Sequence, residues 1–124
     1  MIMGIGIDMV EVDRIAEKIV KENGFKEKIF SPGEIAFCEG KKNKGQHYAA
    51  RFAAKEAFLK ATGLGLSLGH TLSQIEIIPD AAGKPEIFLS GRFAQLAQER
   101  EWNTIQVTLT HVQAMACAVV ILER

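Results

Sequence analysis

The chain has 124 residues, 48% of them apolar, and no long segment is biased in composition. Fifteen basic and fifteen acidic residues cancel, which argues against nucleic-acid or membrane binding driven by overall charge and leaves recognition to local patches. We expect one domain over residues 1–124, too small for a deep cleft of its own, which favours an active site shared between subunits.

The compartment is predicted from cysteine usage and hydropathy. Cys38 and Cys117 form neither a disulfide framework nor a zinc motif. No basic region precedes the apolar N-terminal run, and the longest apolar segment, residues 115–122, is too short to span a bilayer. We therefore expect a cytoplasmic protein.

The first predicted element is a strand over residues 2–10, in which large apolar side chains alternate with small or acidic ones. One face carries Met3, Ile5, Ile7 and Met9, and the other carries Gly4, Gly6 and Asp8. The second face has almost no side chains before its carboxylate, so a ligand or another backbone could approach closely. Asp8 itself fits either a functional role or the N-cap of the next helix.

Three helices follow. Residues 11–23 show helical spacing of apolar side chains and end at Gly24. Residues 32–39 begin with a capping box formed by Ser31 and Glu34. A polar, basic loop over 41–47 is either merely mobile or able to reach phosphate, and a long helix covers 46–62.

A basic stripe is predicted along the exposed side of helix 11–23. It consists of Arg14, Lys18 and Lys21, with Lys28 beyond the helix. The stripe suits either an ordinary solvated face or a docking surface for an acidic partner.

The long helix is apolar on two sides, so we expect it to be buried. Glu56 and Lys60 lie four residues apart on one edge between those sides, one above the other. We therefore expect this pair where water is scarce, although the same spacing is typical of a surface ion pair.

The second half of the chain is predicted to be mostly β-structure. The glycines in 63–69 either cap the long helix or surround an anion with N–H groups. Strands over 72–79 and 85–90 form a hairpin, a helix covers 92–101, and strands over 104–110 and 115–122 form a second hairpin with His111 at its tip. We expect an α+β fold, with a mainly antiparallel sheet packed against the long central helix.

Several polar residues resist a purely structural account. They are Asp8, Arg51, Glu56, Lys60, Gly63, Gly65 and His111. Two carboxylates with basic groups and glycine amides suit a magnesium ion that holds a pyrophosphate, which points to phosphoryl-type transfer.

Three segments carry a family resemblance: GIGIDMVEVDRI at 4–15, RFAAKEAFLKATGLG at 51–65 and GKPEI at 83–87. Together they resemble holo-acyl-carrier-protein synthase, the short bacterial class of 4′-phosphopantetheinyl transferase, and the similarity runs essentially end to end. The resemblance implies that family's fold. It also implies an enzyme that moves the 4′-phosphopantetheine arm of coenzyme A onto a serine hydroxyl of apo-acyl carrier protein and releases adenosine 3′,5′-bisphosphate.

The resemblance also assigns roles to residues. Asp8 and Glu56 would bind Mg²⁺ and, with Lys60, form the catalytic set; the base is either Glu56 or a metal-bound water. Coenzyme A would contact Lys42, Lys44, Arg51, Lys60, Gly63, Gly65, Gly83, Lys84, Pro85 and His111. The acidic carrier protein would bind Arg14, Lys18, Lys21 and Lys28, and the chain would form a homotrimer with sites between neighbouring chains.

The preferred acceptor is a free carrier protein of fatty-acid synthesis, and two alternative functions stay open. The transferase could serve the carrier domain of a large synthase. Less expected is a trimer that binds coenzyme A without chemistry.

Overall fold

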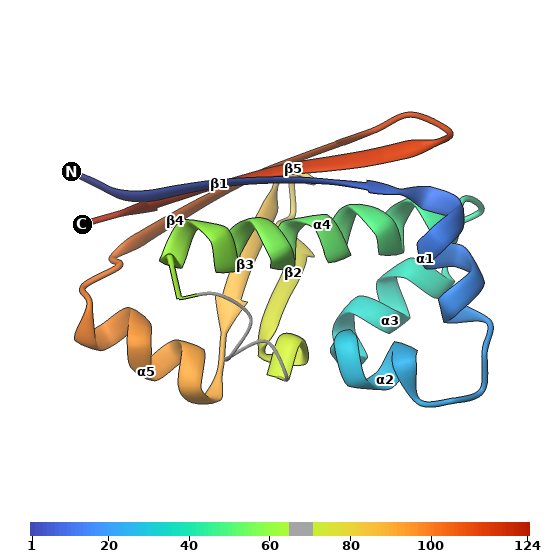
Figure 1. The fold of residues 1–124 in the computed structure, drawn as a ribbon, viewed down its shortest axis with the longest axis horizontal. Coiled ribbons are helices and arrows are strands. Elements are labelled where there is room, and N and C mark those ends of the chain that lie inside the picture. The colour runs from blue at the N-terminus through green and yellow to red at the C-terminus, as the bar shows by residue number, and fades with distance from the viewer. Residues whose placement is uncertain (65–70) are drawn as a thin grey trace.

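A three-stranded antiparallel sheet packs against one long helix in the computed structural model, which describes residues 1–64 and 71–124. The strands are β1 (Ile2–Glu11), β5 (Met115–Glu123) and β4 (Thr104–His111), in the order β1-β5-β4. Helix α4 (Lys44–Thr62) runs along one face of this sheet (Figure 1). The predicted α+β fold, with an antiparallel sheet on a long central helix, is confirmed.

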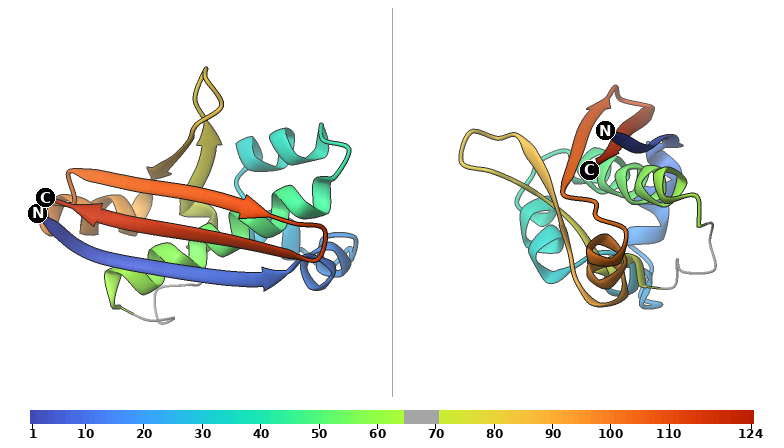
Figure 2. Two further views of the ribbon diagram at one scale, coloured as in Figure 1. Left: turned by 90° about the horizontal axis from the view of Figure 1, so that it is seen from above. Right: turned by 90° about the vertical axis from the view of Figure 1, so that its left-hand side faces the viewer.

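The other elements surround α4 (Figures 1 and 2). Helices α1 (Val12–Ile19), α2 (Phe25–Ile29) and α3 (Pro32–Glu39) gather at its N-terminal end, and α5 (Gly91–Glu99) lies near the other. Strands β2 (Ile75–Pro79) and β3 (Pro85–Leu89) form a separate hairpin that projects from the body. No helix in the described ranges is both long and apolar enough to cross a membrane.

The glycine face of β1 explains how closely the sheet approaches α4. A Cβ added to Gly4 would lie 2.0 Å from the Ala61 carbonyl oxygen, and one added to Gly6 would lie 1.9 Å from that of Ala57. The close approach predicted for this face is therefore made by another backbone, that of α4. The opposite face of β1 points outward, with Ile7 59% and Met9 64% exposed.

Several predicted boundaries were wrong. The expected helix over 11–23 ends at Ile19; residues 20–24 form an exposed turn and bends, and the short helix α2 after Gly24 was missed. Helix α4 starts at Lys44, inside the predicted loop, and β2 starts at Ile75, after a 3₁₀ turn over 71–74. His111 ends β4 opposite Ala116, so it precedes the hairpin turn. The capping box of Ser31 and Glu34 is confirmed.

Candidate active site

Asp8 and Glu56, far apart in the sequence, come together where β1 crosses α4. The Lys60 ammonium donates to Asp8 Oδ1 and to the Ile7 carbonyl oxygen, each at 3.0 Å. Asp8 lies within β1, and Glu11 holds the N-cap position of α1. The capping alternative for Asp8 is therefore wrong. Packing of the glycine face on α4 thus places one carboxylate of the predicted pair beside the helix that carries the other.

The electrostatics of Glu56 reflect this arrangement. Burial raises the pKa of Glu56 above the ordinary glutamate value, and the nearby Asp8 carboxylate raises it further. The charges of Lys60 and Arg14 oppose the rise. Two carboxylates that repel each other in a half-buried position favour a cation between them, since a cation would relieve both the repulsion and the cost of burial.

The acidic pair fits a magnesium ion that shares its coordination sphere with a phosphate ligand. Among the residues that the structure describes, no group of three or more His, Cys, Asp or Glu side chains is placed to hold a metal. Mg²⁺ usually keeps several waters and is bound by one or two carboxylates plus substrate phosphates, so it does not require a cage made entirely of protein ligands. Asp8 and Glu56 are the residues that would hold it.

The expectation that Glu56 and Lys60 form a pair in a dry environment was wrong for the lysine. The Lys60 side chain is 57% exposed and pairs with Asp8. The fully buried ion pair is Lys55 with Glu34, whose Nζ and Oε1 atoms are 2.7 Å apart and whose side chains are both 0% exposed. No role was predicted for Lys55, because spacing along the sequence does not reveal a partner on another helix.

The buried pair has a full set of hydrogen bonds. Lys55 Nζ also donates to the carbonyl oxygens of Leu72 and Ile75. Glu34 Oε2 accepts from the Ile77 amide at 2.9 Å. Desolvation lowers the pKa of Lys55, and the Glu34 carboxylate opposes that change. The pair therefore ties α3 and the start of β2 to α4, the helix that carries Glu56 and Lys60.

A pocket of about 250 Å³ lies on another side of α4. Its walls come from α3, α4, the β2–β3 hairpin and β4. The lining residues are Phe37, His47, Ala50, Arg51, Pro79, Gly83, Pro85, Thr108, Leu109 and His111. Four of the residues predicted to bind coenzyme A are thus brought together: Arg51, Gly83, Pro85 and His111.

Arg51 is set firmly into this pocket. Its side chain donates to the Ile77 carbonyl oxygen at 3.2 Å and to that of His47 at 3.4 Å, and its guanidinium carbon lies 4.2 Å from the centroid of the Phe37 ring. Only 3% of the residue is exposed. No lining residue is acidic, so the guanidinium gives the pocket a fixed positive charge. The buried Glu34 carboxylate, outside the lining, also acts on Arg51 and opposes the lowering of its pKa by burial.

Three residues near this pocket were missed by the sequence prediction. Phe37 and His47 line it, and Lys41 Nζ lies 4.6 Å from the Phe37 ring centroid. His47 precedes Arg51 by four residues and so shares its helical face, which is a signal that the spacing contained. The sequence contained no comparable signal for Phe37, because α3 meets α4 only in the folded chain.

The remaining residues assigned to coenzyme A are more scattered. Gly63 has φ 71° and caps α4, its amide donating to the Lys60 carbonyl oxygen at 3.2 Å, while Gly65 lies outside the described residues. Lys84 is exposed in the hairpin turn, where its amide donates to Asp80 at 2.9 Å. Lys42 is exposed in the turn before α4, and Lys44 does not line the Arg51 pocket.

The two halves of the predicted site lie on opposite sides of α4. At 100° per residue, Arg51 points about 140° away from Glu56 and about 180° away from Lys60 around the helix axis. The sheet contacts the alanine face between these directions. Within one chain, the acidic pair and the basic pocket are therefore separated by the body of the helix.

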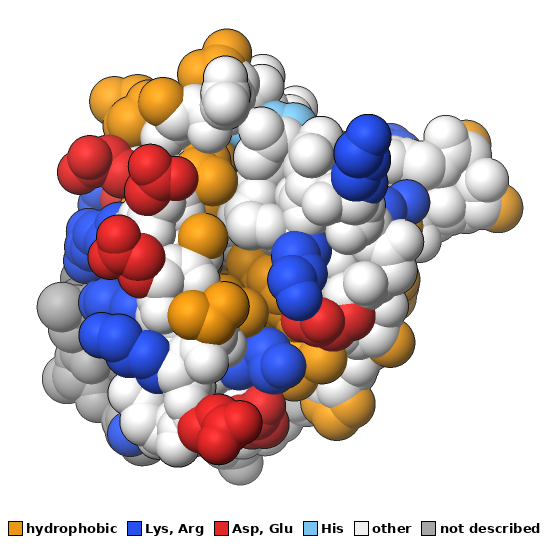
Figure 3. All heavy atoms as spheres, turned by 90° about the vertical axis from the view of Figure 1, so that its right-hand side faces the viewer, with side chains coloured by type: hydrophobic (Ala, Val, Ile, Leu, Met, Phe, Trp, Pro, Cys, Tyr) orange, Lys and Arg blue, Asp and Glu red, His pale blue; other side chains and the backbone are white. Residues whose placement is uncertain are grey.

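The predicted basic stripe is a surface of mixed charge. Arg14, Lys21 and Lys28 are exposed, whereas Lys18 is half-buried with its Nζ 5.6 Å from the Phe25 ring centroid. Figure 3 shows acidic and basic side chains interspersed on this end of the molecule. The surface therefore still suits both alternatives, a docking surface for an acidic partner and an ordinary solvated face.

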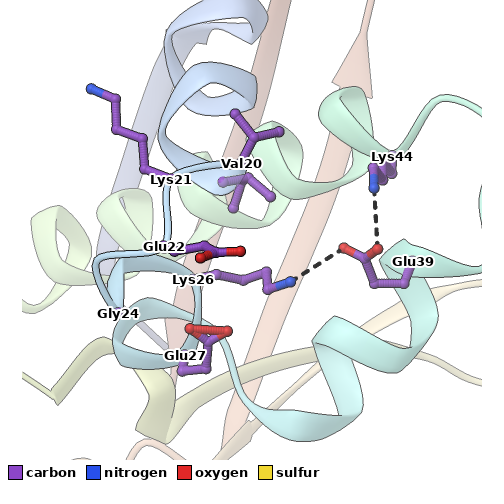
Figure 4. A pocket seen from close by; sticks show the side chains of 9 residues that line it. Val20, Lys21, Glu22, Gly24, Lys26, Glu27, Glu39 and Lys44 are labelled. Atoms are coloured by element: carbon purple, nitrogen blue, oxygen red, sulfur yellow. Dashed lines mark hydrogen bonds and ion pairs between the residues drawn. The ribbon is translucent and has the colours of Figure 1, made fainter.

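A hollow of about 510 Å³ lies beside this surface, between the end of α1, α2, α3 and the start of α4. Figure 4 shows Lys26 and Lys44 converging on Glu39, at 3.8 and 3.2 Å. Glu22 and Glu27 also line it. The lysines of this hollow therefore have carboxylates beside them, whereas Arg51 lies in a pocket whose lining contains no carboxylate.

Comparisons with known proteins agree with this geometry. A sequence model described as the 4′-phosphopantetheinyl transferase superfamily matches residues 4–120. The holo-[acyl-carrier-protein] synthase of Geobacter sulfurreducens is 46% identical, covering 100% of this chain and 99% of that protein.

Solved structures of similar proteins agree as well. The holo-[acyl-carrier-protein] synthase of Neisseria meningitidis superimposes with a TM-score of 0.90 at 31% identity, covering 100% of both chains. The one from Bacillus anthracis, in complex with CoA (3′,5′-ADP), has a TM-score of 0.80 at 32% identity, covering 98% of this chain and 96% of the other. The chain therefore belongs to the 4′-phosphopantetheinyl transferase superfamily, in the family of the holo-[acyl-carrier-protein] synthases.

Proposed function

We propose that this chain transfers the 4′-phosphopantetheine arm of coenzyme A to a serine hydroxyl of apo-acyl carrier protein, in a Mg²⁺-dependent reaction that releases adenosine 3′,5′-bisphosphate. The observation that carries the proposal is the convergence of Asp8 and Glu56, which leaves two carboxylates close enough for Asp8 to raise the pKa of Glu56. The names of the relatives and the coenzyme in the Bacillus anthracis structure support the donor and the acceptor.

The residues of the acidic cluster have separate tasks in this proposal. Asp8 and Glu56 hold the cation, which when bound supplies positive charge to the pyrophosphate of coenzyme A. Lys60 orients the Asp8 carboxylate through its 3.0 Å hydrogen bond and adds charge for the same pyrophosphate. The acceptor hydroxyl needs a base, for which Glu56 or a metal-bound water are the candidates.

The basic pocket would hold the nucleotide end of coenzyme A. Arg51 supplies positive charge, Arg51 and His111 supply hydrogen-bond donors for a phosphate, and Gly83 and Pro85 form a wall of the pocket for the adenine. The long side chains of Lys42, Lys44 and Lys84 would make further contacts with coenzyme A. Gly63 and Gly65 would contact its pyrophosphate.

We propose that the complete site forms between two chains of a homotrimer. The acidic cluster and the basic pocket lie on opposite sides of α4, so one extended coenzyme bridges them most simply when each comes from a different chain. The outward face of the sheet offers an interface. Its central row consists of Ile7, Val119 and Thr108, paired across the three strands, and Ile7 is 59% exposed.

The carrier protein would dock on Arg14, Lys18, Lys21 and Lys28. Acidic helical carriers complement such a surface, and charge complementarity mainly accelerates encounter and fixes register. Charge reversal at Arg14 and Lys21 should raise KM for the carrier more than KM for coenzyme A. Unchanged constants would leave these residues as a solvated face. We place the protein in the cytoplasm, for which its two free cysteines are suited.

The deciding experiment mixes protein, coenzyme A, Mg²⁺ and apo-carrier protein and follows the mass of the carrier. We expect a mass gain of one phosphopantetheine arm that disappears with a chelator and returns with Mg²⁺. Coenzyme A binding without any mass gain would favour the non-catalytic trimer. Competing a free carrier with an excised synthase carrier domain ranks the two acceptors, and a faster reaction with the domain would favour the large-synthase alternative.

A further inference from the structure

His47 is a second histidine in the basic pocket, and the proposed function leaves it without a role. Its ring centroid is 5.7 Å from that of His111 on β4, with the ring planes 66° apart. The same ring meets the edge of Phe37 on α3, again at 5.7 Å. Both histidines line the pocket, so two imidazoles from different elements meet beside the Arg51 guanidinium.

The surroundings of His47 are positively charged. The groups that face it are Arg51 on its own helix, Lys41 in the turn after α3 and His111 on β4. The β2–β3 hairpin contributes only Pro79, Gly83 and Pro85 to the lining. Within residues 1–64 and 71–124, no hydrogen bond joins either imidazole to another side chain or to the backbone. The ring nitrogens are therefore free to contact a ligand.

These surroundings determine the charge of the unliganded ring. Burial lowers the pKa of His47, and the charges of Arg51, His111 and Lys41 lower it further. The ring is therefore neutral at neutral pH when the pocket contains only solvent. A phosphate dianion nearby would reverse the balance, because an opposite charge within a few ångströms favours the protonated form.

We infer that His47 is a further phosphate-binding residue of this pocket, and that it takes up a proton from solvent when a phosphomonoester of the coenzyme binds. This inference rests on the proposed function, because coenzyme A supplies the phosphomonoester. No covalent bond changes; the proton moves from solvent to the free ring nitrogen, where the imidazolium then donates to a phosphate oxygen. Affinity is highest below the pKa of the unliganded ring and decreases as pH rises through the pKa of the liganded one.

Calorimetry with adenosine 3′,5′-bisphosphate as the probe tests this directly. Titrations at about pH 6 and about pH 8 bracket an ordinary histidine, and two buffers with different ionisation enthalpies report the number of protons taken up. The matched variant is His47→Phe, which keeps a flat ring against Phe37 but lacks the titrating nitrogens. Ionisation of the probe itself is common to both proteins and cancels in the comparison.

We expect wild type to take up more protons than His47→Phe. We also expect wild type to lose more affinity than the variant between the two pH values, by roughly tenfold for each pH unit over which one proton is linked to binding. Equal proton numbers and equal losses of affinity would overturn the inference while leaving the proposed function intact. If wild type does not bind the probe at either pH, the proposed function and the inference both fail. If His47→Phe melts at a lower temperature, His47→Gln, which keeps hydrogen bonding without titrating, replaces it under the same criteria.

Discussion

Replacing Gly6 by alanine tests whether the approach of β1 to α4 builds the acidic site. The added Cβ would lie 1.9 Å from the Ala57 carbonyl oxygen and 2.7 Å from the Ala61 amide nitrogen. Both are backbone atoms of a helix, so no side-chain rotation relieves the clash. Restoring a separation of 3.0 Å requires β1 and α4 to move apart by at least 1.1 Å. Overpacking of this kind costs about 2–3 kcal/mol.

The same displacement would disturb the site, because Asp8 lies two residues beyond Gly6 on the same face of β1. A shift of this size would move Asp8 away from the helix that carries Glu56 and Lys60, and a misplacement of about 1 Å can reduce turnover by about 10²-fold. For a chain of this length we expect the melting temperature of Gly6→Ala to fall by on the order of 10 °C. Thermal unfolding at fixed protein concentration and the carrier-modification assay measure the two effects.

A control variant separates the clash from the general effect of losing a glycine. Gly40 has φ −77°, and its added Cβ would approach no atom closer than 3.6 Å. Gly40→Ala should change stability by less than about 0.5 kcal/mol and leave activity unchanged. If Gly6→Ala proved as stable and active as Gly40→Ala, the packing of β1 on α4 would not be what positions Asp8.

Three further predictions concern charge and assembly. Glu56→Gln should reduce turnover by orders of magnitude yet stabilise the metal-free protein at neutral pH, because the raised pKa of Glu56 in the folded state means that its charged form is unfavourable there. This gain in stability should vanish as pH falls below the unfolded pKa of about 4.3, where the carboxyl is neutral in both states. A gain in stability that persists in acid would show that it does not come from the Glu56 charge. Lys55→Met should cost about 3–5 kcal/mol in denaturant unfolding, since it leaves Glu34 charged and buried, and the partner change Glu34→Gln in the same background should restore part of that loss. Ile7→Asp should shift the mass measured by light scattering from trimer to monomer and lower activity at low protein concentration, whereas an unchanged mass would exclude the sheet face as the interface.

Local patterns were sufficient to predict most of the elements. The alternation in β1, the capping box before α3 and the hairpin turn near Gly83 are each formed by neighbouring residues, so a sequence window contains the interactions that produce them. Predictions weakened where a partner is distant. Lys55 provides the clearest case: its place in the motif resembles that of Lys60, and only α3 and the segment before β2 make it a buried cation.

The candidate site shows the same division. Asp8 and Glu56 were identifiable because a strand with a carboxylate on its glycine face and a buried helix that carries another carboxylate are unusual in a small domain. The contacts of His47 and Phe37 were not identifiable, because α3, α4 and β4 come together only through folding. The family resemblance provided the reaction, which residue periodicity alone does not specify.

The sequence by itself determined most of the element types and the two antiparallel hairpins, since each depends on spacing along a short stretch of chain, and it singled out Asp8 and Glu56 as the candidate acidic pair. Tertiary structure alone decided that the glycine face of β1 contacts the alanine face of α4, that the buried cation is Lys55, and that the acidic cluster and the basic pocket lie on opposite sides of one helix. The physical reason is that packing and desolvation depend on which surfaces meet, and residues distant in sequence determine which surfaces meet.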